Sequence, residues 1–210
     1  MAGVEAQEHP DLMAESSLAA PTPSGSVAVP LTGFAVGAVV AVLVGVFGRV
    51  HDPTLAGTTT LGFRTVLAMK VVVSVAIGVI AVLQLLGALW LYGKLGVRQP
   101  AWLGTAHRVS GSIGVVLIVF VAYHCLWALG LEYGTLPDGE PVSTRTLVHG
   151  ILGCLVIGAL VTKVLAVRSR QAPGWFLPVA GGLLFTLLVA AVLTSAVWYL
   201  TTKGWPASGY

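Results

Sequence analysis

Two histidines interrupt long apolar stretches of this sequence, and they are its strongest candidates for chemistry. His124 lies in VAYHCLWALG, and His149 lies in LVHGILGC. The segment LEYGTLPDGEPVSTR joins the two stretches, so the end of one and the start of the next share a membrane side. Ionisable side chains within a membrane are costly and usually functional. The spacing therefore predicts a pair of imidazoles at similar depth on two helices.

Paired imidazoles from different membrane helices are typical of a site for haem b. Such a site needs a neutral imidazole on each axial face, an apolar cavity and polar groups for the propionates. Gly153 follows His149 by one helical turn on the same face, which leaves room for a flat ring. We therefore expect one haem b near the outer face, with His124 and His149 as its axial ligands.

A basic residue is expected to meet the haem propionates. Lys70 lies near the start of the apolar stretch 66–92, on the same membrane side as the histidine pair. Its position predicts an ion pair with a propionate, and Arg64 and Arg145 are alternatives. The other interpretation is that the Lys70 side chain only extends to the membrane surface.

Two other interpretations of the histidines remain open. His51 follows the first apolar stretch and reaches the same membrane side, and imidazoles suit copper or zinc, so His51, His124 and His149 are also candidates for a non-haem metal site. Alternatively, the polar residues only join helices in an accessory subunit of a respiratory complex. Interhelical hydrogen bonds of that kind contribute about 0.6 kcal/mol on average.

A second polar cluster is expected at the opposite membrane surface. His107 precedes His124 by 17 residues, which is about 25 Å along a helix, so these two cannot hold one metal. His107 and Arg108 open their span, and Lys163 is expected to point into the bundle near the same surface. Their donors suit a quinone carbonyl or a lipid headgroup, although anchoring charges at a helix end explain them equally well.

The composition determines which elements position these residues. Of the 210 residues, 56% are hydrophobic and only 9% are charged, which excludes a water-soluble globular fold. Each apolar stretch is long enough to cross a bilayer as a helix. The sequence predicts an all-α integral membrane bundle of five transmembrane helices in the lipid bilayer, with spans at about 31–48, 66–92, 106–131, 146–167 and 176–201.

The chain ends differ from this membrane domain of residues 31–203. Residues 1–30 are acidic and rich in proline, which predicts a disordered tail without a cleavable signal peptide, and residues 204–210 form a short second tail. Lys and Arg number six on the amino-terminal side and five on the other, which favours a cytoplasmic amino terminus and an outer carboxyl terminus.

Several other functions lack their signatures. The net charge of +3 and the absence of a basic surface argue against nucleic-acid binding. The sequence has no CxxC, CxxCH or Walker motif and no convincing serine triad, and Cys125 and Cys154 are expected to be packed thiols.

Short motifs add a resemblance to known families. AHRVSG at 106–111 resembles the HRxSG segment of the cytochrome b subunits of succinate dehydrogenases, and AYH at 122–124 is similar to their haem-ligand region. That family has a quinone-binding serine three residues before the histidine, where this chain has Gly104. VHDPT, LLGALWLYGKLG, TKVLAVRS and PGWFLPVAGG resemble an uncharacterised bacterial membrane family that is loosely similar to cytochrome b561.

The resemblance implies electron transport in a bacterial plasma membrane. The b561 pattern has two haems held by four histidines, whereas spans two and five of this chain contain no histidine. The sequence therefore predicts a b-type cytochrome, or the cytochrome subunit of a redox complex, that relays electrons through one haem with other subunits or a quinone as partners.

Overall fold

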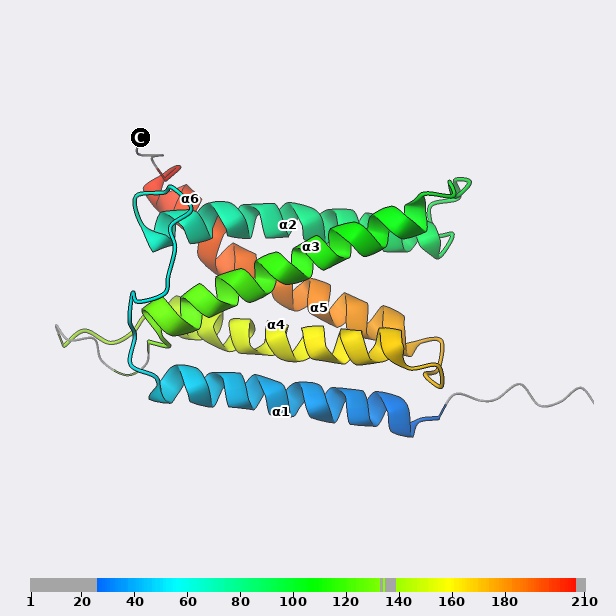
Figure 1. Ribbon diagram of the computed structural model, residues 1–210, viewed down its shortest axis with the longest axis horizontal. Helices are drawn as coiled ribbons and strands as arrows, with labels where there is room; N and C mark the ends of the chain where they lie inside the picture. The colour runs from blue at the N-terminus through cyan, green and yellow to red at the C-terminus, as the bar shows by residue number, and fades with distance from the viewer. Residues whose placement is uncertain (1–25, 133, 135–138, 207–210) are drawn as a thin grey trace, which may run out of the picture.

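The structure is a computed structural model that describes residues 26–132, 134 and 139–206 (Figure 1). In this part of the chain five helices are long and apolar enough to cross a membrane, which confirms the predicted all-α bundle. Their ends lie within about three residues of the predicted spans. The described elements are α1 (Ala28–Val50), α2 (Val66–Leu91), α3 (Leu103–His124), the π-helix η1 (Cys125–Leu129), α4 (Thr144–Arg168), α5 (Phe176–Val192), the π-helix η2 (Leu193–Val197) and α6 (Trp198–Lys203).

The predicted tails fall mostly outside this part of the chain. Residues 1–25 and 207–210 are not among the described residues, and α1 already begins within the predicted tail of residues 1–30. The start of α1 and the end of α6 lie at opposite ends of the bundle, as an odd number of spans requires (Figure 1).

Local sequence signals explain where several helices begin and end. The Thr65 hydroxyl accepts a hydrogen bond from the Ala68 amide, and the Ser143 hydroxyl accepts one from the Thr146 amide. Each cap satisfies an amide that has no partner in the first helical turn. The helical segment that η1 completes ends at Gly130, whose φ of +68° suits glycine better than other residues.

The helices pack as a series rather than as a closed ring. α1 contacts α4, α4 contacts α5, α5 contacts α2, and α2 contacts α3. By contrast, α3 and α4 make few contacts with each other, although α3 crosses in front of α4 and α5 in Figure 1. The contact between α3 and α4 is therefore a loosely packed seam of the bundle.

The apolar core lies next to this seam. Its buried members come from α2, α3, α4 and α5, and Ile77, Ile118, Leu188 and Ala191 lie at its edge, where they also line a cavity. Towards the end of the bundle that contains the α4 amino terminus, side chains no longer fill the space between the four helices. This change from core to cavity positions the candidate site.

Candidate functional site

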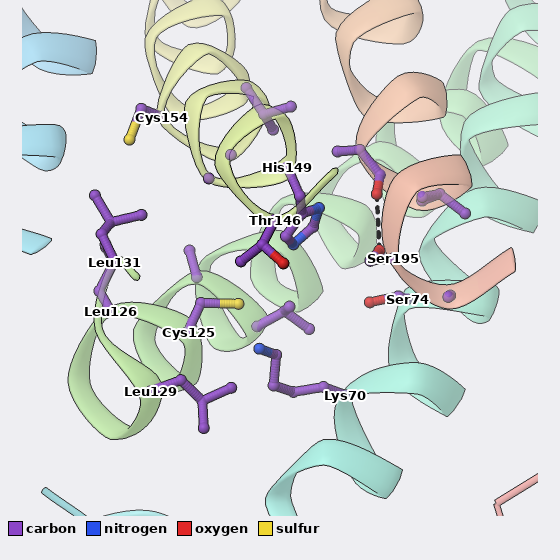
Figure 2. Close-up of a pocket in the computed structure, with 18 of the residues that line it drawn as sticks. Lys70, Ser74, Cys125, Leu126, Leu129, Leu131, Thr146, His149, Cys154 and Ser195 are labelled. Carbon is purple, nitrogen blue, oxygen red and sulfur yellow. Dashed lines mark hydrogen bonds between the residues drawn. The ribbon is translucent and has the colours of Figure 1, made fainter. Parts of the chain in front are cut away.

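A cavity of about 350 Å³ lies in the seam between α3 and α4. This volume is within the range of about 300–1,000 Å³ that is usual for small-molecule and cofactor sites. Most of its lining is aliphatic, and its polar side chains gather toward one end (Figure 2). Lys70, His149 and Gly153, which were predicted from the sequence, line this one cavity, and so does Arg145, one of the two alternatives to Lys70.

The His149 imidazole contacts Thr194 of η2, and the Thr194 hydroxyl is in turn hydrogen-bonded to the end of α5. The imidazole Nδ1 lies 3.3 Å from the Thr194 hydroxyl oxygen. That hydroxyl donates its own proton to the carbonyls of Ala190 and Ala191, at 2.9 and 3.1 Å, so its oxygen must accept from Nδ1–H. Nδ1 therefore carries the ring proton, and Nε2 keeps its lone pair.

Glycine leaves space beside this imidazole. A Cβ atom added at Gly153 would meet no other atom within 4 Å. Because Gly153 and His149 line the same cavity from one face of α4, a flat molecule has room to approach the ring there.

Two cations stand near His149 at the polar end of the cavity. The Lys70 side chain extends from α2 into the cavity (Figure 2), and it lies within electrostatic range of His149. The Arg145 guanidinium donates to the Thr194 carbonyl at 2.8 Å and lies 3.6 Å from the centre of the Trp198 ring. Arg145 is therefore fixed by the protein, whereas Lys70 has no hydrogen bond or ion pair with any residue that the structure describes.

Both π-helical segments line this cavity. Cys125, Leu126 and Leu129 of η1 face it from one side, and Ser195 and Ala196 of η2 face it from the other. In η2 the Ser195 hydroxyl donates to the Ala191 carbonyl at 2.7 Å, as Figure 2 shows. This bond competes with the backbone amide that would otherwise donate to the same carbonyl in an α-helix. Single turns of π-helix occur frequently at functional sites.

His124 does not share this cavity in the structure. It lies about 100° around the helix from its neighbour Cys125, which does line the cavity. The imidazole is only 2% exposed, its Nδ1 lies 2.9 Å from the Phe120 carbonyl, and its Nε2 accepts from the Thr59 amide at 3.2 Å. The expected pair of His124 and His149 is therefore not brought together, and ligation by His124 stays a prediction that requires its bond to Thr59 to break.

His51 lies in an aromatic stack rather than beside His149. Its ring stacks on Phe47 at 5.0 Å and on Trp127 at 4.3 Å, and its buried Nε2 has no hydrogen bond in the described part of the chain. Among residues 26–132, 134 and 139–206, no three His, Cys, Asp or Glu side chains form a group suited to a metal ion. The metal alternative with His51, His124 and His149 thus has no assembled site here.

The cluster at the opposite end is only partly assembled. Lys163 lies within electrostatic range of His107, whose buried Nδ1 lacks a hydrogen bond among the described residues and faces Gly87. Gln84 donates to the His107 carbonyl at 2.9 Å, which ties this end of α3 to α2. Arg108 is exposed and reaches the Thr105 hydroxyl at 3.4 Å, so it does not join the other two.

Sequence reasoning missed the residues that orient His124 and His149. Thr194 is the partner of His149, and the Thr59 amide, from the connection between α1 and α2, is the partner of His124. The adjacent Thr194 and Ser195 within an otherwise apolar span were the available signal for the first. A backbone amide has no signal in the sequence, so the second could not be found.

Comparison with known proteins identifies the family of the chain. No curated protein and no solved structure is significantly similar to it. The model of a family of unknown function, DUF6529, matches residues 27–207, which include all five spanning helices. The chain is therefore a multi-pass membrane protein that belongs to the DUF6529 family.

Proposed function

We propose that the protein is a membrane b-type cytochrome, or the cytochrome subunit of a redox complex, whose single haem b lies in the cavity between α3 and α4. The observation that carries the proposal is the orientation of His149. Histidines that bind metals usually donate their other ring N–H to a protein oxygen, which fixes the tautomer. His149 meets this condition through Thr194 before any metal is bound.

The rest of the cavity also fits such a group. Its aliphatic wall excludes water from the body of a porphyrin, and Gly153 leaves room for the edge of the ring beside the ligand. Haem iron supplies one-electron transfer, and burial and axial ligation set its potential. In this chain, His149 would bind the iron, Thr194 would hold the imidazole, and Lys70 would face the propionates.

His124 is the proposed second axial ligand. Its Nδ1–H donates to the Phe120 carbonyl, so Nε2 has the lone pair that ligation needs. A single bond of 3.2 Å to the Thr59 amide occupies this lone pair, and η1 begins directly after the histidine. A local change in η1 that turns the ring, together with loss of the Thr59 bond, would free His124 for the metal.

The absorption spectrum of the purified full chain tests this proposal. The wild-type protein should show a Soret band and, after reduction, the α band of a b-type haem. His149→Ala should lose the bound haem. His107→Ala should retain it, because His107 lies near the start of α3, at the other end of the bundle. This variant therefore controls for the loss of a half-buried imidazole as such.

Other outcomes favour different functions. A colourless protein that contains copper or zinc would support the site of His51, His124 and His149. A colourless protein without metal would support the accessory subunit. Equal haem content in His149→Ala and wild type would also contradict the proposal.

A quinone at the opposite end is the second part of the proposal. The His107 Nδ1 atom supports it, since this buried atom has no hydrogen-bond partner among the residues that the structure describes, and a carbonyl oxygen would accept a hydrogen bond from it. Lys163 is the nearby cation that would strengthen such a contact.

The proposed location is a bacterial plasma membrane, with the amino terminus in the cytoplasm and the haem toward the outer face. The excess of Lys and Arg on the amino-terminal side supports this orientation. A reporter fused after Tyr210 should be active outside the cytoplasm, and one at Met1 should be active inside. Reversed activities would place the cavity at the inner face.

A further inference from the structure

The Lys70 side chain is half-buried near the start of α2, at one end of the bundle. It lies in the second turn of α2 and lines a cavity whose wall is mostly aliphatic. A charge removed from water is costly unless it is paired, and charged side chains in membrane helices usually have a partner. No residue in the described part of the chain supplies a hydrogen bond or an ion pair to Lys70.

The surrounding groups increase the positive potential. Lys70 and Arg145 both lie within electrostatic range of His149, and Arg145 is kept near the cavity by Thr194 and Trp198. Glu132 is the acidic residue on the cavity wall, but it is exposed and makes no salt bridge with Lys70. Two cations therefore lie near His149, and only Arg145 is held by other groups among the described residues.

Hydroxyl groups on the cavity wall add capacity for hydrogen bonds to oxygen. Ser74 lies one turn after Lys70 on the same face of α2, and Thr146 lies one turn before His149 on α4. The Thr146 hydroxyl also lies 2.8 Å from the Ser143 hydroxyl and accepts from Arg145 at 3.4 Å, so a ligand oxygen would join contacts that already exist. Figure 2 shows the ammonium of Lys70 between these two elements, in the opening that separates α2 from the start of α4.

We infer that Lys70 and Arg145, with Thr146 beside them, form a subsite for an anionic oxyacid group on an amphiphile whose apolar body lies in the cavity. Two sources share this chemistry, namely a haem propionate and the phosphate of an acidic phospholipid. The first source rests on the proposed function, whereas the second does not. The occupant of the cavity must therefore carry a negative charge. A ligand that only binds His149 would not need one.

The test compares two ligand pairs that differ in charge, with the full chain in neutral detergent. One pair is haem and haem dimethyl ester, and the other is phosphatidylglycerol and phosphatidylcholine. Wild type should bind the acidic member of at least one pair about tenfold more tightly, which corresponds to about 1.4 kcal/mol. Lys70→Gln should remove this preference and leave the affinity for the neutral member unchanged.

Lys203→Gln is the matched control, because Lys203 is an exposed cation at the same end of the bundle and does not line the cavity. It should keep the preference. A preference in the haem pair identifies the propionate as the source, and one in the lipid pair identifies the phosphate. If wild type shows no preference in either pair, or if Lys70→Gln keeps it, the inference is wrong.

The lipid measurement also separates this inference from the proposed function. It is made without haem, so a preference for phosphatidylglycerol that survives in His149→Ala supports the anion subsite even if haem does not bind. The opposite result is also possible, namely haem binding that depends on His149 without a preference for the acidic member of either pair. That result would support the cytochrome proposal and contradict the anion subsite.

Discussion

Glycine residues of α4 allow a close helix contact on the side of α1 and leave open space on the side of α3. On the side of α1, Gly37 and Gly158 bring two backbones so close that a side chain on either glycine would collide with the other helix. Thr162 closes this contact by donating to the Gly33 carbonyl at 3.1 Å. On the side of α3, Gly153 faces open space, and a cavity takes the place of a helix contact.

The difference shows that glycine content alone does not reveal how a membrane helix is used. Small residues allow close helix packing, and lipid provides no hydrophobic force between helices, so direct contact must hold α1 to α4. The same absence of a side chain leaves room for a ligand where the neighbouring helix stands away. Substitutions on the two sides of α4 should therefore have different consequences.

The largest effect is expected at the contact between α1 and α4. Gly158→Leu should destabilise the bundle by at least the roughly 1–3 kcal/mol that is usual for overpacking, because the blocked atoms belong to the Gly37 backbone and cannot move aside easily. Unfolding in mixed micelles measures this loss. Gly181→Leu on α5 is the control, since a Cβ atom there meets nothing within 4 Å, and equal stability of the two variants would refute the close contact.

Gly153→Leu should affect binding rather than folding. The new side chain has room in the cavity, so stability should change little, but it would occupy the space beside His149. Haem content of the purified variant should fall strongly while its unfolding curve stays close to wild type. Full haem content would show that the ligand does not use this face of α4.

A smaller effect is expected at Thr194, which orients His149. Thr194→Val removes the acceptor for Nδ1–H and should weaken haem affinity by about 10–100-fold, as is typical when a residue that supports a metal ligand is changed. Thr186→Val is the matched control, because Thr186 makes the same hydrogen bond to the carbonyl four residues earlier but touches no histidine. If haem titration gives the same affinity for the two variants, Thr194 does not orient His149 for binding.

The smallest effect should come from Arg108 at the far end of the bundle. Arg108 is exposed and stands apart from His107 and Lys163, so Arg108→Gln should slow haem reduction by a quinol analogue only slightly. Lys163→Gln should slow it more, because Lys163 lies within electrostatic range of His107. Stopped-flow measurements give both rates of haem reduction. If both variants react as fast as wild type, these residues are only anchoring charges at the helix ends.

Much of the candidate site could be predicted from periodicity along single helices. Lys70, Ser74 and Ile77 share one face of α2 and do line the cavity, as do His149 and Gly153 on α4. The direction of the His124 side chain was harder to predict than its depth in the membrane. Depth follows from the position of a residue along its helix, whereas the direction around the helix axis depends on how neighbouring helices pack. The bond of His124 to Thr59 depends on the path of the connection between α1 and α2, which no periodic pattern describes.

The sequence by itself determined that this chain forms five spanning helices and which ionisable residues lie at each membrane surface. Those properties depend on hydrophobic length and on the fixed rise of an α-helix, which are local to each segment. Only the tertiary structure decided that α4 packs on α1 and α5 but leaves a cavity toward α3, and that His149 and Lys70 share this cavity while His124 does not. These outcomes depend on which helix surfaces fit together, and that fit is a property of pairs of helices rather than of any single segment.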